Sequence, residues 1–335
     1  MSEKKWLLRS PLQITGSNDS EVGVVPYFAR MSKKLAIILV NWNSFPVTAG
    51  CIESLRLADY TDHSVIVVDN GSADGSGKEL KEKFGHIILI ESATNLGFTG
   101  GNNLGMEYAI EQGYEYVLLL NNDTFVEKDF LTVLVTYMDS HPEAGVIQPL
   151  IYFDHDRSLV WTAGSYYNKW LGYTASVNYN KPLEKENAQI KEVDWITGCA
   201  FFTRASVLKE TGLLADNLFI YYEDVDLSFR IKKAGHKLIY HPGSVIYHIA
   251  GMSNKNKVKG KEGFVNPIVH YLNVRNRIWF LKRYTSPLHS LTVIPFNFFY
   301  IIALMAYFAL RLRFRKLKTV VKAVKDGLSG NIHYK

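Results

Sequence analysis

The sequence predicts an α/β fold in which a Rossmann-like, mostly parallel sheet is flanked by helices and followed by a C-terminal helical segment. Leu35–Asn41 and residues 116–120 are continuous apolar runs, as expected for strands that are covered on both faces. Helical segments of about ten residues separate such runs, which is typical of parallel strand–helix–strand units. At 335 residues and 47% hydrophobic content, the chain can bury one large core or two modest ones.

The expected elements of the first half alternate between strand and helix. Strands are predicted at Leu35–Asn41, Ser64–Asp69, His86–Glu91 and 116–120. Helices are predicted at Val47–Leu57, near Lys78–Phe84, at Gly101–Glu111 and at Phe125–Met138.

The second half is less regular. Residues 152–193 are rich in Tyr, Trp and Asn and predict no regular element. Beyond them we expect a strand at Val193–Thr203, a helix at Val225–Ala234 and short strands at Lys237–Tyr240 and Ser244–His248. Residues 251–263, rich in Lys, Gly and Asn, predict a mobile loop, after which the chain becomes helical and increasingly apolar.

Composition and known motifs exclude several classes of protein. The two cysteines, Cys51 and Cys199, provide neither metal-ligand spacing nor a disulfide framework, which favours a reducing compartment. Residues 1–30 are polar and lack the apolar core of a signal peptide, so we expect an extension outside the core fold. The turn at residues 40–44 lacks the glycine fingerprint of dinucleotide sites, and Gly71–Lys78 fails the spacing of a phosphate loop.

Asp123 is the most informative residue of the first half. It follows the apolar strand at 116–120 together with Asn121 and Asn122. Ligands of open α/β sheets bind at the carboxyl ends of the strands, and a carboxylate there suits a hard divalent cation shared with substrate phosphates. The alternative is a polar turn in which Asp123 caps the helix that follows.

Two loops are expected at the same edge of the sheet. Asp69 ends the second strand, and its carboxylate can accept the ring N–H of a uracil or thymine. The alternative is an Asx-turn and a helix N-cap supplied by Ser72 or Asp74. Residues 94–103 contain glycines, which permit close backbone approach to a ligand. They also contain asparagines at the start of a predicted helix, and a helix N-terminus favours anions. A glycine-rich loop without a ligand is the alternative there.

Two further candidates lie in the second half. Glu223 and Asp224 follow four apolar or aromatic residues, which favours a partly desolvated general base. Helix capping is the alternative for this acidic run, and it accounts best for Asp226, with Arg230 four residues on as its partner. His248 ends the last short strand. A single histidine is more often structural than a ligand, although imidazole suits manganese better than calcium.

These elements together resemble the inverting family 2 glycosyltransferases, over a stretch from about Lys34 to Gly251. Within that family the chain is most similar to rhamnosyltransferase-type enzymes of bacterial surface-polysaccharide synthesis. The matching segments, in the order of the family, are Val40-Asn41-Trp42-Asn43, Val67-Val68-Asp69-Asn70-Gly71-Ser72, Asn95-Leu96-Gly97-Phe98, Asn121-Asn122-Asp123, Trp195-Ile196-Thr197-Gly198 and Tyr222-Glu223-Asp224-Val225-Asp226-Leu227.

The resemblance implies a GT-A fold, a nucleotide-sugar donor carrying dTDP or UDP, and Mg²⁺ or Mn²⁺ as cofactor. Asp123 matches the last position of the Asp-x-Asp motif and would bind the metal, while Asn121 stands where the first Asp of that motif would lie, so His248 would complete the site. Asp224, beside Glu223, matches the catalytic base. The implied donor-binding residues are Asn41, Asn43, Asp69, Asn70, Gly71, Asn95, Gly97, Phe98, Asn102, Asn121, Asn122 and Asp123, and the implied acceptor residues are Trp161, Trp195 and Gly198.

The chain is predicted to divide into an extension at 1–33, a nucleotide-sugar-binding half at 34–150, an acceptor and catalytic half at 151–255 and a helical region at 256–335. Within the last region, Leu291–Leu310 carries no charge and is long enough to span a bilayer. Seven basic residues and no acid follow between Arg311 and Lys325, which favours attachment to an anionic membrane surface.

Basic residues on both sides of Leu291–Leu310 disfavour a single span, because one basic flank would then lie outside. Nucleotide sugars are made in the cytoplasm, so we expect a peripheral or re-entrant attachment to the cytoplasmic face of the membrane, with Leu317, Val320, Val321, Val324 and Leu328 as an interfacial stripe. The alternatives are a single transmembrane helix, an ordinary buried helix pair or a homo-oligomer contact.

The sequence bears on two other function classes, of which only the first remains open. The first is a binding module of the same fold that holds a nucleotide sugar or glycan without turning it over, for which Asn121 leaves room. The second, a sugar nucleotidyltransferase, requires a basic glycine-rich triphosphate loop near the N-terminus, which the sequence lacks. Nucleic acid is not expected as a partner, because aliphatic rather than stacking residues separate the basic residues of the tail.

Overall fold

The computed structural model describes residues 33–250, 255–260 and 262–330. The predicted N-terminal extension, apart from residue 33, lies outside the described residues, as do positions 251–254 of the predicted loop.

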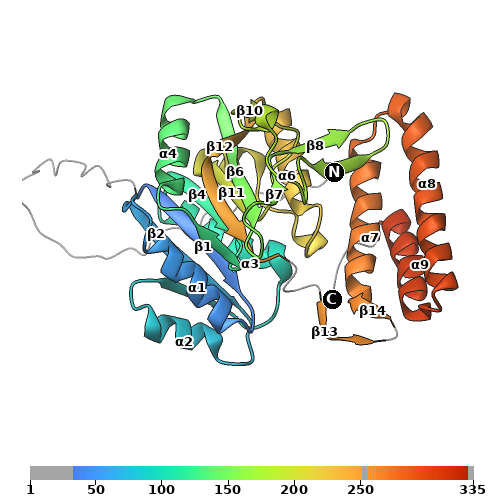
Figure 1. Ribbon diagram of the computed structural model, residues 1–335, viewed down its shortest axis with the longest axis horizontal. Helices are drawn as coiled ribbons and strands as arrows, with labels where there is room; N and C mark the ends of the chain where they lie inside the picture. Colours follow the sequence, from blue (N-terminus) through green and yellow to red (C-terminus); the bar gives the residue numbers. More distant parts are fainter. Residues whose placement is uncertain (1–32, 251–254, 261, 331–335) are drawn as a thin grey trace, which may run out of the picture. The chain divides into compact units, whose positions relative to one another are not determined.

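A mixed sheet forms the centre of the fold. Its main path runs in the order β10-β12-β6-β11-β4-β1-β2-β3, with β5 beside β12 and β7 beside β6 (Figure 1). These strands are β1 (Leu35–Asn41), β2 (His63–Asn70), β3 (Ile88–Ser92), β4 (Tyr116–Leu120), β5 (Thr124–Val126), β6 (Ala144–Phe153), β7 (Val160–Thr162), β10 (Lys191–Glu192), β11 (Ala200–Arg204) and β12 (Lys237–His248).

The strands of the first half are parallel, which brings their carboxyl ends to one edge. In the register of β1 with β2, Asn41 lies opposite Asp69. In the register of β1 with β4, Ile38 lies opposite Leu119, so Asn121 to Asp123 follow at the same edge. β11 runs antiparallel to both β4 and β6. The predicted mostly parallel sheet is confirmed for the first half, and this antiparallel strand joins it to the second half.

Helices cover both faces of the sheet, and each face has its own hydrophobic core. Leu39, Leu118 and other alternate residues of the strands pack with α1 (Phe45–Leu55), α2 (Ser76–Lys83) and α4 (Phe130–Ser140). Ile38 and Leu119 point the other way and pack with α3 (Gly97–Glu111), α5 (Ala205–Thr211) and α6 (Glu223–Lys233). Strands buried on both faces explain why the sequence shows continuous apolar runs rather than alternation.

Several predicted boundaries are wrong, for a common reason. The predicted helix at Phe125–Met138 is split, because Thr124–Val126 forms β5 and pairs with the end of β12 before α4 begins at Phe130. Of the predicted strand Val193–Thr203, only the part from Ala200 forms β11. The two predicted short strands at 237–240 and 244–248 are one strand, β12, with an irregularity between His241 and Val245. Pairing partners distant in sequence decide all three boundaries.

Other elements were not predicted. β6 is a long buried strand, and residues predicted to be irregular contain β7 and the hairpin of β8 (Ser165–Asn168) with β9 (Tyr173–Ser176). The predicted loop at 251–263 instead contains β13 (Lys255–Gly260), which pairs with β14 (Gly263–Val265). Short 3-10 turns occur at Lys185–Asn187 and Asp216–Leu218.

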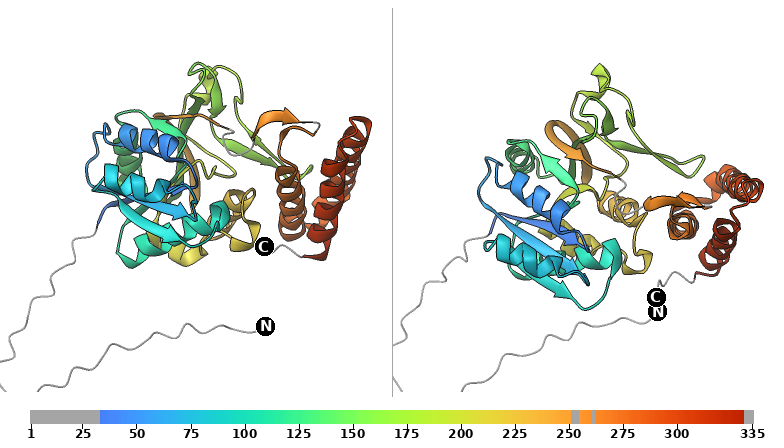
Figure 2. Two further views of the ribbon diagram at one scale, coloured as in Figure 1. Left: turned by 90° about the horizontal axis from the view of Figure 1, so that it is seen from below. Right: turned by 60° about the horizontal axis from the view of Figure 1, so that its bottom comes forward.

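Three helices make up the C-terminal region: α7 (Pro267–Tyr284), α8 (Pro287–Leu310) and α9 (Phe314–Ser329). α7 and α9 lie side by side (Figure 2), and Tyr271, Leu272 and Val274 of α7 pack with Val320 and Ala323 of α9 and Phe308 of α8. Three of the five residues of the predicted interfacial stripe on α9 therefore pack inside the protein: Val320 is fully buried, and Leu317 and Val324 lie against the same core. Val321 and Leu328 are exposed.

Candidate functional site

Asp69 lies at the centre of a buried network at the carboxyl edge of the sheet. Its Oδ1 accepts hydrogen bonds from Asn41 Nδ2 at 2.9 Å and from Ser72 Oγ at 2.5 Å. Asn41 Nδ2 also donates to Ser76 Oγ at 2.8 Å, and Asn41 Oδ1 accepts from Thr48 Oγ1. No hydrogen bond reaches the second oxygen, Oδ2, from the part of the chain that the structure describes, so this oxygen is available to a ligand donor.

The structure places Asn41 and Asn43 around this carboxylate. Asn41 is fully buried, and its amide is engaged by protein groups on both its nitrogen and its oxygen. Asn43 has a left-handed φ of 49°, and its Oδ1 accepts from the backbone N–H of Ala73 at 2.8 Å. Its own backbone N–H donates to Ser72 Oγ. Both asparagines therefore shape the loop that presents Asp69.

A second amide network joins the loops that follow β2 and β3. Asn70 Nδ2 donates to Gly97 O at 3.0 Å and to Asn95 Oδ1, and Asn70 Oδ1 accepts from Leu96 N. Gly71 has φ 72°, and a Cβ there would lie 2.5 Å from the backbone carbon of Thr94. The close approach of these two loops therefore requires glycine at position 71.

Asp123 and its two preceding amides lie beside the first network. Asn122 Nδ2 donates to Thr48 Oγ1 at 2.7 Å, and Thr48 in turn donates to Asn41, which connects the end of β4 to Asp69. Asp123 is 9% exposed, and its Oδ1 lies 3.1 Å from His248 Nε2. Asn121 Nδ2 lies 3.3 Å from the same imidazole nitrogen. The structure thus brings together the residues that sequence analysis assigned to metal and diphosphate.

His248 reaches Asp123 because β12 pairs with β5, which places His248 opposite Thr124. The imidazole is 5% exposed and stands edge-on to the Trp161 ring, with centroids 4.7 Å apart. Its Nδ1 is buried and has no hydrogen-bond partner among the described residues. One carboxylate, one imidazole and an amide are oxygen and nitrogen donors of the kind that Mg²⁺ and Mn²⁺ accept.

The described residues contain no cluster of three or more His, Cys, Asp or Glu side chains that could hold a metal ion by themselves. Mg²⁺ in proteins is commonly held by one or two carboxylates together with substrate phosphates. The residues present fit an ion that takes its remaining oxygen ligands from a diphosphate.

Glu223 and Asp224 begin α6, and the backbone before them is unusual. Phe219, Tyr221 and Tyr222 all have positive φ values, between 67° and 74°. Such values are strained for residues with large side chains and persist only where the surroundings impose them.

The two carboxyls share a buried environment. Glu223 is 4% exposed, and its Oε2 has no hydrogen-bond partner in the described chain. Burial, with the neighbouring Asp224 charge second, raises the pKa of Glu223 well above its usual range. Burial also raises the pKa of Asp224, although the N–H groups of Gly198 and Val225, which donate to its two oxygens at 2.9 and 2.8 Å, oppose that shift.

The segment from Thr197 to Cys199 joins the two halves of the candidate site. Gly198 N donates to Asp224 Oδ2, and Cys199 O accepts from Asn121 N at 2.8 Å. The buried Cys199 thiol has a raised pKa, first because of its burial and then because of the charges of Asp123 and, more weakly, Cys51 and Asp224. The segment therefore bonds to the Asp224 carboxylate on one side and, through Asn121, to the strand end that bears Asp123 on the other.

Phe98 and Gly198 are in contact next to Asp224, since a Cβ on Gly198 would lie 2.9 Å from Phe98 Cζ and 3.6 Å from Asp224 Cβ. Asn102 is buried, and its Nδ2 donates to Phe98 O within α3. Trp195 donates from Nε1 to Tyr166 O, at the β8–β9 hairpin.

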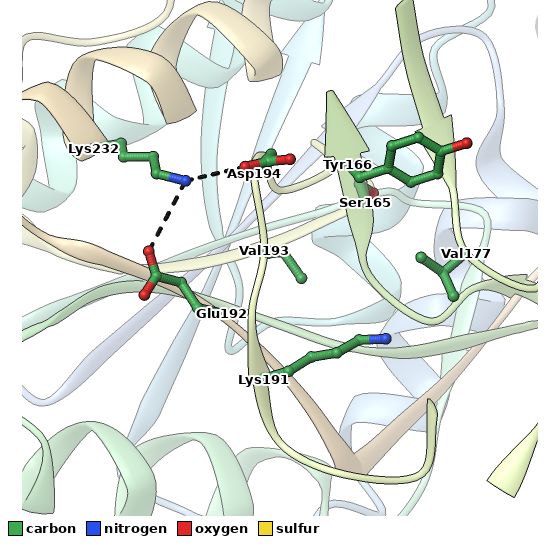
Figure 3. Close-up of a pocket in the computed structure, with 8 residues that line it drawn as sticks. All are labelled: Ser165, Tyr166, Val177, Lys191, Glu192, Val193, Asp194 and Lys232. Atoms are coloured by element: carbon green, nitrogen blue, oxygen red, sulfur yellow. Dashed lines mark hydrogen bonds and ion pairs between the residues drawn. The ribbon is translucent and has the colours of Figure 1, made fainter. Parts of the chain in front are cut away.

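A separate hollow of about 300 Å³ lies beside this hairpin (Figure 3). Lys232 on its rim pairs with Asp194 and Glu192. None of the site residues predicted from the sequence lines this hollow. Lys232 belongs to the end of α6 opposite to Asp224. The lining residues are Ser165, Tyr166, Val177, Lys191, Glu192, Val193, Asp194 and Lys232.

Sequence analysis missed the hydroxyl groups that hold the first network and a set of contacts from α7. Ser76 and Thr48 bond to Asn41 but occur in ordinary helical segments. Arg275 and Asn276 bond to the loop before Glu223 across more than fifty residues of sequence. No local pattern distinguishes Arg275 from its neighbour Arg277, so only the tertiary contact identifies it.

Comparison with known sequences agrees with this geometry. The profile described as Glycosyl transferase family 2 matches residues 36–212, more than half of the chain. The chain belongs to glycosyl transferase family 2. The matched range includes the networks around Asp69, Asp123 and Gly198, and it ends before Asp224 and His248.

Two proteins named as rhamnosyltransferases are relatives of this chain. It is 27% identical over 237 residues to N-acetylglucosaminyl-diphospho-decaprenol L-rhamnosyltransferase of Mycobacterium tuberculosis, covering 65% of this chain and 76% of the relative. It is 23% identical over 270 residues to the dTDP-rhamnosyl transferase RfbF of Shigella flexneri, covering 79% and 86%.

Solved structures confirm the GT-A-like fold. GalNAc-T7, crystallised with UDP, GalNAc and Mn²⁺, matches with a TM-score of 0.58 at 13% identity, over 75% of this chain but only 48% of that protein. The mannosyltransferase PcManGT of Pyrobaculum calidifontis, in complex with GDP-Man and Mn²⁺, matches with a TM-score of 0.54 at 14% identity, over 89% of this chain and 76% of that one.

The raised pKa of Glu223 predicts a pH-dependent effect of Glu223→Gln on stability. Above the ordinary glutamate pKa the unfolded chain releases the proton easily while the folded chain holds it, so the carboxyl makes folding less favourable as pH rises. We expect Glu223→Gln to raise the melting temperature at pH 7.5 and to have no effect below about pH 4.

Thermal melts across pH 4–8 measure this effect. Glu82→Gln, at an exposed position, is the matched control and should change nothing. A melting temperature that falls for Glu223→Gln at pH 7.5 would contradict the assignment of a destabilising buried carboxyl.

Proposed function

We propose that the protein is an inverting, metal-dependent hexosyltransferase. It moves rhamnose or another hexose from a nucleoside-diphosphate donor to a hydroxyl of a glycan or lipid-linked glycan in surface-polysaccharide synthesis. The observation that carries the proposal is the segment 197–199, which bonds on one side to Asp224 and on the other to the strand end that bears Asp123. The two relatives named as rhamnosyltransferases support the choice of sugar.

The donor base would bind at Asp69. Its free Oδ2 can accept the ring N–H of a uracil or thymine, while Asn41 and Ser72 hold Oδ1 in place. The RfbF relative is named for a dTDP sugar and GalNAc-T7 was crystallised with UDP, which supports a pyrimidine donor. Asn95, Gly97 and Asn102, at the start of α3, lie where the ribose and diphosphate would extend.

Asp123 and His248 would hold the divalent cation, with Asn121 beside them, and the diphosphate oxygens would complete its ligands. Mn²⁺ in both solved relatives supports this proposal. When bound, the cation would neutralise the negative charge that develops on the leaving diphosphate.

Asp224 would act as the general base. A carboxylate in this position removes the proton from the acceptor hydroxyl as the oxygen attacks the anomeric carbon. Because a nucleoside diphosphate is already a good leaving group, one base suffices, whereas a glycoside hydrolase needs a pair of carboxyls. A single displacement of this kind inverts the anomeric centre. The burial that raises the pKa of Asp224 also strengthens it as a base.

Asp224→Asn tests this role. We expect kcat to fall by about 10²-fold or more, the usual scale of general-base catalysis, while donor affinity stays unchanged. Release of nucleoside diphosphate from dTDP-rhamnose and UDP-sugars, with Mn²⁺ and a lipid-linked acceptor, measures the rate. Sugar transfer by Asp224→Asn at close to the wild-type rate would show that Asp224 is not the general base. A wild-type protein that binds the donor but never turns it over would instead be a binding module.

Gly77→Ala tests whether Asp69 binds the nucleobase of the donor, without replacing Asp69 itself. A Cβ at position 77 would lie 2.5 Å from Asp69 Cγ and 2.6 Å from Oδ2, so the carboxylate must move. Alanine itself favours the helix, so the fold should persist. We expect the affinity for dTDP or UDP, measured by calorimetry, to fall by about tenfold or more, as when a hydrogen bond to a charged group is lost.

Gly85→Ala is the matched control, because a Cβ there meets no atom within 4 Å and its backbone conformation is ordinary. Equal affinities of the Gly77→Ala and Gly85→Ala proteins for dTDP or UDP would contradict binding of the nucleobase at Asp69.

We further propose that α8 lies in the plane of the membrane interface and does not cross the bilayer. It is long and apolar enough to span a membrane, with a mean hydropathy of 2.0 in its most apolar window and only 17% of that window buried. Yet Asn297 near its centre accepts from Arg277 Nε at 2.6 Å and donates to Leu171 O at 3.0 Å. Leu171 lies in the β8–β9 turn, and a spanning α8 would draw this polar loop into the hydrocarbon.

The opposite side of α8 is available to lipid. Leu291, Ile294, Phe298 and Phe299 are all more than half exposed. The basic residues after Arg311 would face anionic headgroups, which matches the cytoplasmic leaflet. A lipid-linked acceptor, such as the one named for the Mycobacterium relative, would be reached from this surface.

The substitutions Ile294→Ser and Phe298→Ser test the interfacial position of α8. These side chains are 66% and 59% exposed and lie one helical turn apart. We expect each substitution to lower binding to vesicles containing anionic phospholipid by about tenfold or more, since a fully buried side chain of this size contributes about 1.5–3 kcal/mol. Vesicle co-sedimentation measures this binding.

Leu57→Ser is the control, because Leu57 is 73% exposed in the nucleotide-binding half and should not affect binding. Unchanged sedimentation of both the Ile294→Ser and the Phe298→Ser proteins would contradict the proposed surface.

A further inference from the structure

The loop at residues 217–222, directly before α6 and the candidate base Asp224, is bonded to α7. Asn276 Nδ2 lies within hydrogen-bond distance of three backbone oxygens of this loop, which share its two N–H donors: Leu218 O at 3.0 Å, Ile220 O at 2.9 Å and Tyr221 O at 2.9 Å. Arg275 Nη2 donates to Asn217 O and Leu218 O at 3.2 and 3.1 Å. Both side chains are fully buried. A buried arginine and a buried asparagine are retained only where such partners satisfy them.

The same loop also packs its side chains into the C-terminal helices. Phe219, Ile220 and Tyr221 contact the core formed by Tyr271, Leu272, Val274, Phe308, Val320 and Ala323. On its other side, Phe219 O accepts from Thr99 N at 3.1 Å, next to the glycine-rich turn of α3. The loop therefore lies between the donor-binding half and the C-terminal helices.

The backbone of this loop is strained, and the bonds from α7 account for its persistence. Phe219, Tyr221 and Tyr222 have φ values of 67°, 74° and 70°. Residues of this size avoid the left-handed region unless surrounding contacts impose it. Asn276 contacts the carbonyls of Leu218 and Ile220, which lie on either side of Phe219, and that of Tyr221, which is itself strained. Glu223 and Asp224 follow directly.

A second contact holds the helix that bears the base. Asp226, one turn into α6, is 1% exposed and accepts from Tyr284 Oη at 2.5 Å and from Arg230 Nε at 2.9 Å. Tyr284 is the last residue of α7, so α7 contacts both the loop before Asp224 and the helix after it.

We propose that Arg275 and Asn276 are positioning residues that hold Asp224 in its reactive place through the 217–222 loop. The C-terminal helices, beyond any contact with a membrane, would thus be part of the catalytic apparatus. This inference rests on the proposed role of Asp224 as the base. A base displaced by about 1 Å can cost on the order of 10²-fold in rate, so the effect is large enough to measure.

The test replaces Asn276 by Asp in the full chain. Asn276→Asp removes the N–H donors but keeps the oxygen that accepts from Arg275 Nε at 2.8 Å. Asn273→Asp is the matched control on the same helix, because Asn273 Nδ2 donates only within α7, to Val269 O. Arg275→Lys is a second variant that keeps the charge and removes the planar fork.

Two measurements are made on each protein. Peptide-level hydrogen exchange measures how strongly the backbone amides of residues 213–226 are protected, and it requires no enzymatic activity. Steady-state kinetics between pH 5 and 9 report kcat, KM for the donor and the acidic limb of the rate profile. Glu223 and Cys199, whose pKa values are raised by burial and in part by the charge of Asp224, are unchanged in every variant, and Arg275→Lys adds no new carboxyl to the rate profile.

For Asn276→Asp and Arg275→Lys we expect faster exchange confined to residues 213–226 and a fall in kcat of roughly 10- to 100-fold. KM for the donor should stay within about twofold of the wild-type value, because the contacts that bind the donor equally in the ground state and the transition state are not altered. The acidic limb should move to lower pH, since a loosened carboxyl regains water and its pKa falls toward the ordinary value. Asn273→Asp should behave as wild type.

The proposal is overturned if the exchange rate of residues 213–226 does not change, or if exchange rises while kcat and the acidic limb stay as in wild type. Failure of the proposed function is distinguishable: a protein with no transferase activity would show the exchange difference without any rate to compare.

Discussion

The hydrogen bond from Gly198 N–H to Asp224 Oδ2 is the contact on which the candidate site depends. It joins a buried carboxyl on α6 to the segment that, one residue later, bonds to the end of β4. A hydrogen bond to a charged group is worth about 1.5–3 kcal/mol, enough to offset part of the cost of burying the carboxylate. Because β11 starts at Ala200, the antiparallel strand that follows holds this segment in register with β4.

Neutral amides and hydroxyls make most of the hydrogen bonds around Asp69 at the carboxyl edge of the sheet. Asn41, Asn70 and Thr48 are buried and bonded to protein groups on several atoms, so they orient loops instead of presenting free groups to a ligand. Asp69, in contrast, keeps one oxygen without a partner among the described residues. A rigid frame that leaves a single acceptor free provides specificity, because a ligand lacking the matching donor would leave that acceptor unsatisfied.

The C-terminal helices contact two separate parts of the protein. α8 presents an apolar surface on one side and is tied through Asn297 to the β8–β9 turn on the other. α7 binds the loop and the helix that flank Asp224. α7, α8 and α9 pack together, and this one set of helices contacts both the β8–β9 turn and the loop before Asp224.

The sequence by itself determined the parallel first half, the strand ends that carry Asp69 and Asp123, and the acidic start of α6. Those features follow from local periodicity and from the rule that ligands bind at strand carboxyl ends. Only the tertiary structure decided that residues 124–126 are a strand, that His248 reaches Asp123, and that Arg275 and Asn276 hold the loop before Asp224. Each of these depends on pairing between residues far apart in the chain. Local patterns carry no information about which distant partner will satisfy a buried polar group, because that choice is made by the packing of the whole fold.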